Sequence, residues 1–158
     1  IVQHMPSAFL GPFAERINKI CRITVKIAED GEPLTPGTFL VGPGGTHLKL
    51  NRKGKRSATV HLSPEPSDSL HRPSVNQIFL SVAKTYPSTG LGVIMTGMGN
   101  DGLEGAKAMK KANCGIIAQD AASCVVYGMP RAVVDENLTD MIAPLDLLHS
   151  IILSAVRR

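Results

Sequence analysis

The segment TGMGNDG, residues 96–102, combines residue types that suit two different chemistries. Its three glycines have the spacing G-x-G-x-x-G, which in dinucleotide-binding folds lets the backbone approach a pyrophosphate at the start of a helix. Asp120 follows about where such folds place the acid that binds a ribose hydroxyl. Asp101 argues against this interpretation, because its carboxylate would repel a phosphate in that position. A dinucleotide-binding Rossmann-type domain therefore stays an alternative.

The second chemistry is acyl transfer, for which His4 and Asp101 are the candidate residues. An aspartate beside a histidine accepts a hydrogen bond from one imidazole nitrogen, and the other nitrogen, with an ordinary pKa near ~6.5, can then act as a base. The glycines around Asp101 indicate a backbone that presents N–H groups, such as that of Met98, to a developing oxyanion. The structural alternatives are a surface or helix-capping His4, and an Asp101 that caps a helix beginning at Gly102.

Such a pair requires a nucleophile, and none of the hydroxyls or thiols in the chain has a suitable setting. The sequence contains no G-x-S-x-G motif, Ser74 begins an expected helix and Ser88 lies in an expected loop. Ser123 lacks a sharp strand-to-helix turn, and Cys124 lies in an apolar run that is typical of a core thiol. We therefore expect the nucleophile to be absent from residues 1–158.

The elements that must position His4 and Asp101 alternate between strand and helix. An open, mostly parallel α/β sheet with helices on both faces is predicted, with one antiparallel hairpin at 46–63. In such sheets the carboxyl ends of the strands form one rim, and we expect His4, the GPGG loop, residues 96–102 and Asp120 to meet there. Helices are expected at 6–20, 73–86, 102–112, 129–137 and 145–156, and strands at 22–30, 37–45, 91–95, 115–119 and 140–145.

Composition limits the remaining function classes. With 158 residues, 43% hydrophobic and 19% charged, the chain is typical of one globular domain. Three cysteines without a C-x-x-C pair favour a reducing cytoplasm, with each thiol packed as a small apolar group. The basic run NRKGKR, residues 51–56, has no interleaved aromatic residues and is expected to be a solvated turn, not a nucleic-acid site. No apolar stretch reaches the length of a membrane span, so no membrane insertion is expected.

Several motifs together resemble the catalytic domain of the bacterial chemotaxis protein-glutamate methylesterase family: IVQHMP, AEDGEPLTPGTFLVGPGGTHL, HRPSV, VIMTGMGNDG and ASCVVYGMP. The resemblance follows the whole chain in order and implies a doubly wound α/β fold with a Ser-His-Asp triad. It assigns the triad base to His4, the orienting acid to Asp101 and a backbone oxyanion donor to Met98. The family's serine lies in a loop upstream of QHMP. We therefore expect residues 1–158 to be a methylesterase catalytic domain that lacks its amino-terminal strand and nucleophile loop.

The resemblance also implies an activity and partners. Family members hydrolyse glutamate methyl esters on the signalling helices of methyl-accepting receptors, and many deamidate receptor glutamines. They usually carry an amino-terminal receiver domain, and their chemistry requires neither a metal nor an organic cofactor. A receptor-docking module without catalysis is a further alternative.

Overall fold

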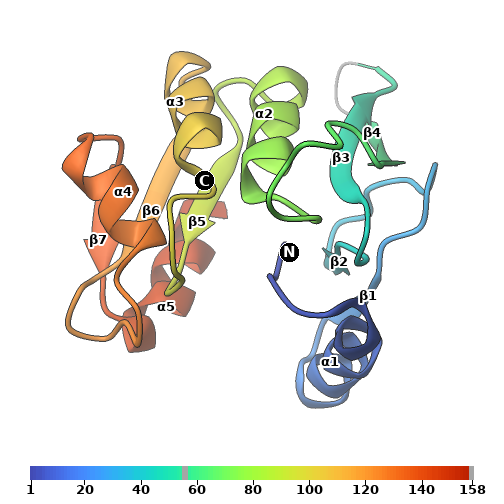
Figure 1. The fold of residues 1–158 in the computed structure, drawn as a ribbon, viewed down its shortest axis with the longest axis horizontal. Coiled ribbons are helices and arrows are strands. Elements are labelled where there is room, and N and C mark those ends of the chain that lie inside the picture. Colours follow the sequence, from blue (N-terminus) through green and yellow to red (C-terminus); the bar gives the residue numbers. More distant parts are fainter. Residues whose placement is uncertain (55–56, 157–158) are drawn as a thin grey trace.

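A computed structural model of the chain describes residues 1–54 and 57–156 (Figure 1). The expected α/β architecture is present, with element boundaries close to those predicted. The helices are α1 (Ser7–Ile20), α2 (Val75–Thr85), α3 (Leu103–Lys111), α4 (Met129–Asp135) and α5 (Leu145–Val156). The strands are β1 (Thr24–Ile27), β2 (Thr38–Val41), β3 (His47–Arg52), β4 (Ala58–Ser63), β5 (Leu91–Ile94), β6 (Gly115–Gln119) and β7 (Met141–Ala143).

The carboxyl-terminal half is a parallel sheet of order β5-β6-β7 with helices on both faces. Side chains of α2, α3 and α4 pack on one face of this sheet, around Phe79, Met109 and the fully buried Ile116. Leu148 of α5 packs on the other face against Ile117 and Ala143. Because β6 is covered on both sides, its residues form a nearly continuous apolar run, as is typical of a central parallel strand.

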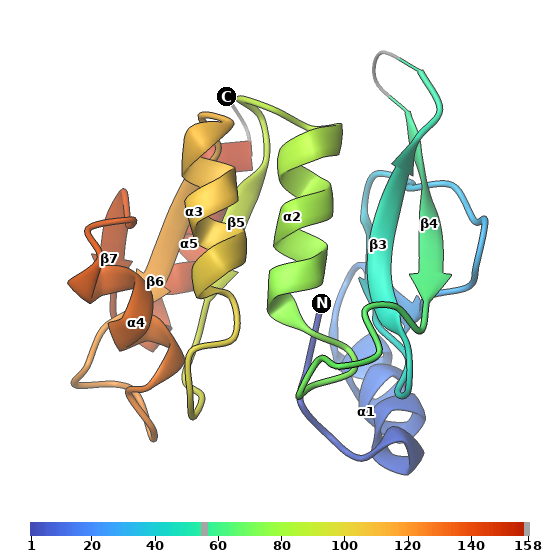
Figure 2. The same ribbon diagram turned by 45° about the horizontal axis from the view of Figure 1, so that its top comes forward.

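The amino-terminal half has its own small sheet, in which β1 and β2 pair in parallel. Helix α1 packs on one face of this pair through Leu10 and Ala14. The antiparallel hairpin β3–β4 packs on the other face, where Leu40 meets Leu48 and Val60. Figure 2 shows α2 standing between this hairpin and α3. The predicted hairpin is thus confirmed, although the strands in the described part of the chain form three separate sheets and not one.

Ile1 extends the small sheet beyond β2 and so fixes the segment that carries His4. The amino group of Ile1 donates a hydrogen bond to the Leu40 carbonyl at 2.6 Å, and the Gly42 amide donates to the Ile1 carbonyl at 2.9 Å. This is the bonding pattern of a parallel ladder. The amino terminus therefore lies between the two halves of the molecule (Figures 1 and 2).

Some local expectations require correction. Helix α2 begins at Val75 with Ser74 as its N-cap, so Pro73 lies outside the first turn where we expected it. Cys21 is exposed at the end of α1, and of the three thiols only that of Cys114 is fully buried. Lys55 and Arg56, part of the expected basic turn, lie outside the described residues. Among the helices of residues 1–54 and 57–156, none is long and apolar enough to cross a bilayer.

Candidate active site

His4 and Asp101 meet at the boundary between the two halves of the molecule, although 97 positions separate them in the chain. His4 Nε2 lies 2.8 Å from Asp101 Oδ2, and the two side chains are 23% and 7% exposed. The ladder of Ile1 brings His4 to this place, and the loop after β5 brings Asp101. The predicted hydrogen-bonding contact is therefore present. The catalytic roles of the two residues stay a prediction.

Three further donors hold the carboxylate of Asp101. Ser74 Oγ donates to Oδ1 at 2.8 Å, the Val75 amide to Oδ2 at 2.7 Å and the Asn76 amide to Oδ1 at 3.0 Å. Desolvation by itself would raise the pKa of Asp101, but the hydrogen bonds from His4, Asn76, Val75 and Ser74 outweigh it and hold that pKa well below its ordinary value. Asp101 is therefore an anion at neutral pH and restricts the hydrogen-bonding roles of His4.

Asp101 does cap a helix, but not the one expected. Helix α3 begins at Leu103 after Gly102, whose φ is +104°, and has no side-chain cap at its N-cap residue. Asp101 instead receives the amides at the start of α2, while Asn76 Oδ1 accepts the amides of Gly102 at 3.1 Å and Gly105 at 2.8 Å. The two helices thus cap each other reciprocally, and this exchange fixes the loop that carries Asp101.

The imidazole of His4 is held on its edge and on one face. Its ring stacks on that of His71, with ring centroids 4.1 Å apart and an interplanar angle of 17°. Within the described part of the chain, Nδ1 of His4 has no hydrogen-bond partner, so this atom is free to exchange a proton with a reactant. Beside the pair is a cleft of about 200 Å³ whose lining includes Leu70, His71, Asn100 and Asp101.

The loop that contains Met98 is tied to its neighbour, the loop before α4. The Gly97 amide donates to the Val126 carbonyl at 3.0 Å, and the Gly97 carbonyl accepts from the Met129 amide at 2.8 Å. The side chain of Gln119, which is fully buried, connects the two loops by hydrogen bonds. Its Oε1 accepts the Thr96 amide at 2.9 Å, and its Nε2 donates to the Ser123 carbonyl at 2.9 Å.

This arrangement exposes the part of the loop that was expected to bind an oxyanion. The side chain of Met98 points outward, with the residue 82% exposed, and its amide has no acceptor among the described residues. The glycines allow close packing against protein groups. A Cβ on Gly97 would lie 2.5 Å from Sδ of Met129, and Gly99 has a φ of +83°. The Met98 N–H is thus available to a bound oxygen atom.

The contacts of the loop do not favour the dinucleotide alternative. Two amides that could bind a pyrophosphate are already used, since that of Gly97 donates to Val126 and that of Gly102 to Asn76. The anionic Asp101 occupies the start of α2. Asp120, the expected ribose-binding acid, accepts a 2.6 Å hydrogen bond from Ser123 instead.

Neither internal candidate for a nucleophile is in contact with His4. The hydroxyl of Ser123 bonds Asp120 and also accepts the Leu145 amide at 3.0 Å, which is a structural role. Desolvation and the charge of Asp120 raise the pKa of the Cys124 thiol, so this sulfur is not a ready thiolate. Within residues 1–54 and 57–156, no cluster of three or more His, Cys, Asp or Glu side chains could hold a metal ion.

Sequence reasoning missed several residues that shape this site. His71, Asn76 and Gln119 were not predicted to take part, and Ser74 was considered only as a nucleophile. His71 and Ser74 both lie in the motif HRPSV, so that motif was the available signal. Asn76 and Gln119 have no such signal, because their contacts are with loops more than twenty positions away or with the backbone.

Comparison with known proteins places these features in a family context. The family model described as CheB methylesterase matches residues 1–152. The chain is 46% identical over 157 residues to a protein-glutamate methylesterase/protein-glutamine glutaminase of Oleidesulfovibrio alaskensis, covering 99% of this chain and 42% of that relative. It is 48% identical over 156 residues to a protein of the same description from Lawsonia intracellularis, covering 99% of this chain and 43% of the relative.

The fold has a close counterpart among solved structures. The crystal structure of the CheB methylesterase catalytic domain of Thermotoga maritima superposes with a TM-score of 0.91 at 35% sequence identity, covering 99% of this chain and 80% of that one. The present chain thus spans about two fifths of the length of the curated relatives it matches, but most of this catalytic-domain structure.

Proposed function

This chain belongs to the CheB methylesterase family, and from that premise we propose that it supplies the base, the orienting acid and an oxyanion donor of a protein-glutamate methylesterase. The observation that carries the proposal is the 2.8 Å contact between His4 Nε2 and Asp101 Oδ2. Asp101 stays anionic and accepts a hydrogen bond from Nε2–H of His4, so Nδ1 of His4 is the atom that accepts and returns a proton during the reaction.

The nucleophile in this proposal is a serine outside residues 1–158. Its hydroxyl oxygen attacks the ester carbonyl of a glutamate methyl ester, and its proton passes to Nδ1 of His4. The Met98 amide stabilises the resulting oxyanion. Collapse breaks the bond to the methoxy oxygen, which takes the proton from His4 and leaves as methanol. Water then attacks the acyl-enzyme, again with His4 as base, to release glutamate and regenerate the serine.

The same steps accommodate a glutamine side chain, in which case the leaving group is ammonia. The two relatives are described both as methylesterase and as glutaminase. We infer that the substrate of this chain is likewise a protein-bound glutamate methyl ester, with glutamine as a second substrate. The proposed partner is the signalling helices of methyl-accepting receptors. The proposed reaction requires no organic cofactor. The free cysteines support a cytoplasmic location.

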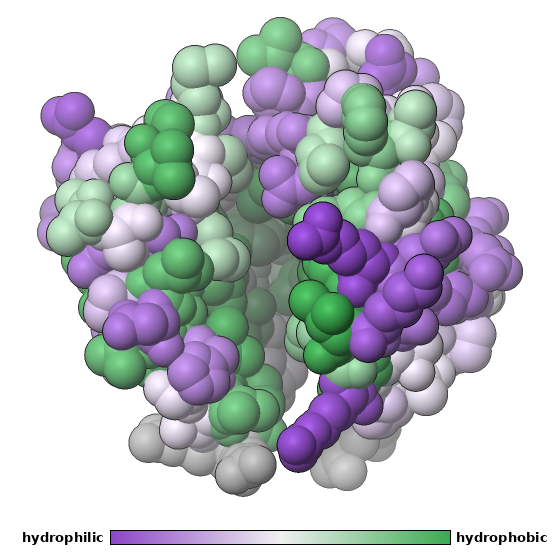
Figure 3. Space-filling view, turned by 90° about the horizontal axis from the view of Figure 1, so that it is seen from below, coloured by the Kyte–Doolittle hydropathy of each residue, from purple (hydrophilic) through white to green (hydrophobic). Residues whose placement is uncertain are grey.

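The serine is proposed to arrive on a strand that continues upstream from Ile1. Ile1 already pairs with the edge of β2, and among the described residues no strand pairs with β5 on the side away from β6. Figure 3 shows a furrow between the two halves of the molecule, with apolar residues on both sides of it. A strand in this furrow would join the β1–β2 and β5–β6–β7 sheets, and a loop at its end would reach the rim where His4 lies. The curated relatives are long enough to contain such a strand and a further receiver domain.

The direct test is release of methanol from a methylated receptor by a protein that comprises these residues and the upstream segment. We expect methanol in stoichiometric yield with glutamate, and inhibition by a serine-directed fluorophosphonate. Methanol release that persists after complete fluorophosphonate labelling would contradict a serine mechanism. Binding of the receptor without any methanol release would favour the docking module.

A further inference from the structure

The proposed reaction gives no role to the ring that stacks on His4, which is that of His71. A single hydrogen bond to Asp101 holds Nε2 of His4, but it leaves the ring free to tilt about that bond. Because proton transfer needs Nδ1 within hydrogen-bonding distance of the serine oxygen and aligned with it, a tilt of the ring would misplace it. A second contact is required to define the plane of the ring.

His71 provides a flat surface that meets this requirement. Its centroid lies 4.1 Å from that of His4 with the planes only 17° apart, which is a face-to-face contact. The imidazole of His71 makes no hydrogen bond within the described residues, so its contact with His4 is through the ring face.

The loop that carries His71 is fixed at several points. Ser69 Oγ donates to the His71 carbonyl at 3.1 Å, and the Gly45 amide donates to the Arg72 carbonyl at 3.2 Å. Further back, Nε2 of the fully buried His47 lies 3.1 Å from the Pro66 carbonyl. The ring of His71 is therefore attached to an anchored segment and can restrain the ring of His4.

We propose that His71 is a positioning residue, which orients the proton-transferring His4 through ring stacking and does not itself exchange protons with the substrate. The inference rests on the proposed function, because it assigns His71 a role toward the base of that reaction.

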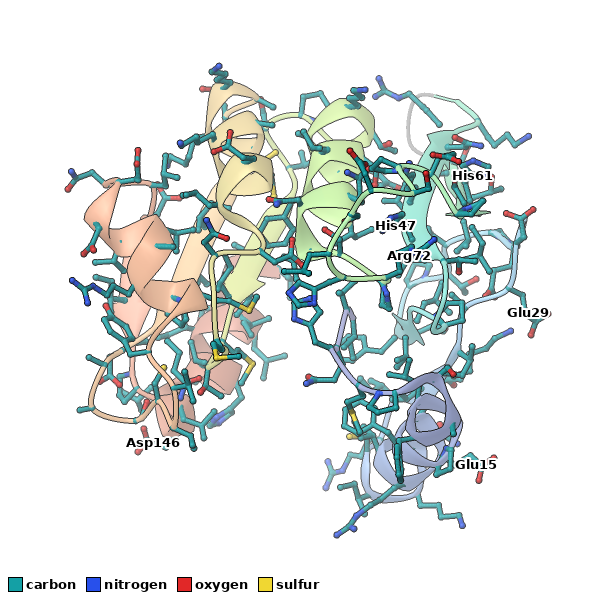
Figure 4. The ribbon with its side chains drawn as sticks, viewed as in Figure 1. Glu15, Glu29, His47, His61, Arg72 and Asp146 are labelled. Carbon is teal, nitrogen blue, oxygen red and sulfur yellow. The ribbon has the colours of Figure 1, made fainter. Side chains whose placement is uncertain are left out.

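The test compares His71→Phe with His71→Leu in the protein that includes the upstream segment. Phenylalanine keeps the flat face without a titratable nitrogen, whereas leucine keeps apolar volume without the face. We expect H71F to retain kcat within about twofold of the unsubstituted protein, and H71L to lose about 3- to 10-fold in kcat with little change in KM. His61→Leu is the matched control, since His61 lies on the hairpin away from the site (Figure 4) and should leave kcat unchanged.

Two results would overturn the proposal. Equal losses of kcat in H71F and H71L would mean that a nitrogen of His71 is required. An unchanged kcat in H71L would mean that the stacking contact is not required. Histidine-selective NMR of the 158-residue chain provides a readout that needs no activity. H71F should retain the low-field Nε2 proton of His4 and H71L should broaden it, and identical spectra would contradict the positioning role. If the unsubstituted longer protein released no methanol, the proposed function would fail while this spectroscopic comparison still decided the role of His71.

Discussion

His4 is the residue on which every proton transfer in the proposed reaction depends. Replacing it with alanine in the protein that includes the upstream segment should lower kcat for methanol release by at least about a thousandfold, because the serine would lose its base and the leaving group its acid. His61→Ala should leave kcat unchanged, as His61 lies on β4, where its Nδ1 is 3.6 Å from Asp30 Oδ1. A decrease of less than tenfold in H4A would show that another group is the base.

Asp101 combines an electrostatic role with a structural one, so its substitution should affect folding as well as activity. Asparagine cannot accept all the hydrogen bonds from Val75, Asn76 and Ser74, and its amide would face another N–H group. We expect D101N to lower the free energy of unfolding of the 158-residue chain by about 2 kcal/mol at pH 7. Urea unfolding followed by circular dichroism measures this. Asp146→Asn, at an exposed position in the first turn of α5 (Figure 4), should change it by less than about 0.5 kcal/mol.

The stability that Asp101 provides should depend on pH in a defined direction. Its pKa in the folded chain lies below the ordinary value of about 3.9, so the unfolded chain binds the proton more readily. The contribution is complete above about pH 5 and decreases as the pH falls through the unfolded pKa toward the folded one. The difference in unfolding free energy between the unsubstituted chain and D101N should therefore shrink between pH 6 and pH 3, to about half or less. A difference that stays constant between pH 6 and pH 3 would contradict a lowered pKa for Asp101. The pKa values of Glu29 and Asp140 are lowered as well, but both groups are present in both proteins, so their effects cancel in the difference.

At the scale of elements, the two loops of the rim act as one unit because their backbones are in close contact at Gly128. A Cβ at this position would lie 2.7 Å from the Gly97 carbonyl oxygen and 3.0 Å from the Gly99 nitrogen. The φ of Gly128 is −101°, so the backbone conformation itself allows alanine and only the contact opposes it. The close approach, not chain flexibility, is what requires glycine here.

Gly128→Ala should therefore separate the two loops and displace the Met98 amide. We expect a loss of about 1–3 kcal/mol in unfolding free energy and a clear decrease in kcat of the longer protein. Gly11→Ala is the matched control. It lies inside α1 with open space around its Cα, so alanine should stabilise the chain by about 0.5–1 kcal/mol without affecting kcat. If G128A had the same unfolding free energy and kcat as G11A, the two loops could move apart without the losses that the contacts at Gly128 predict.

The sequence was a good guide to the elements and a poorer one to their mutual contacts. Periodicity located β6, α5 and the β3–β4 hairpin because each has a strong local pattern of apolar residues. The direction of capping could not be predicted, because an aspartate before a helix has the same local appearance whether it bonds its own helix or a neighbour. Asp101 bonds α2, which begins 26 positions earlier, and only the packing of α2 against α3 makes that possible.

On the scale of the whole molecule, His4 could be paired with Asp101 from the sequence because the carboxyl ends of parallel strands share a rim. The partition of the strands into three sheets was not predictable in the same way, since it depends on which edges are paired. The stack of His71 on His4 was likewise not predictable, because it depends on the path of the loop between β4 and α2.

The proposed strand between the two halves leads to a prediction for the complete molecule. The 158-residue chain should release methanol from methylated receptor at least a thousandfold more slowly than the protein that includes the upstream segment, since no hydroxyl in its described part contacts His4. Both proteins are assayed at equal concentration with the same substrate. Equal rates would show that a residue within 1–158, such as Ser123 or Cys124, is the nucleophile.

The position of Asp101 at the start of α2 also has an evolutionary consequence. Catalytic groups often oppose folding, so their loss commonly makes an enzyme more robust and an inactive descendant can persist. Here Asp101, the proposed orienting acid, also joins two helices through hydrogen bonds. A lineage that lost the proposed reaction by mutating Asp101 would therefore lose conformational stability as well. Descendants that abandon catalysis but keep the scaffold should therefore retain this aspartate and diverge first at His4, whose side chain stabilises no helix end.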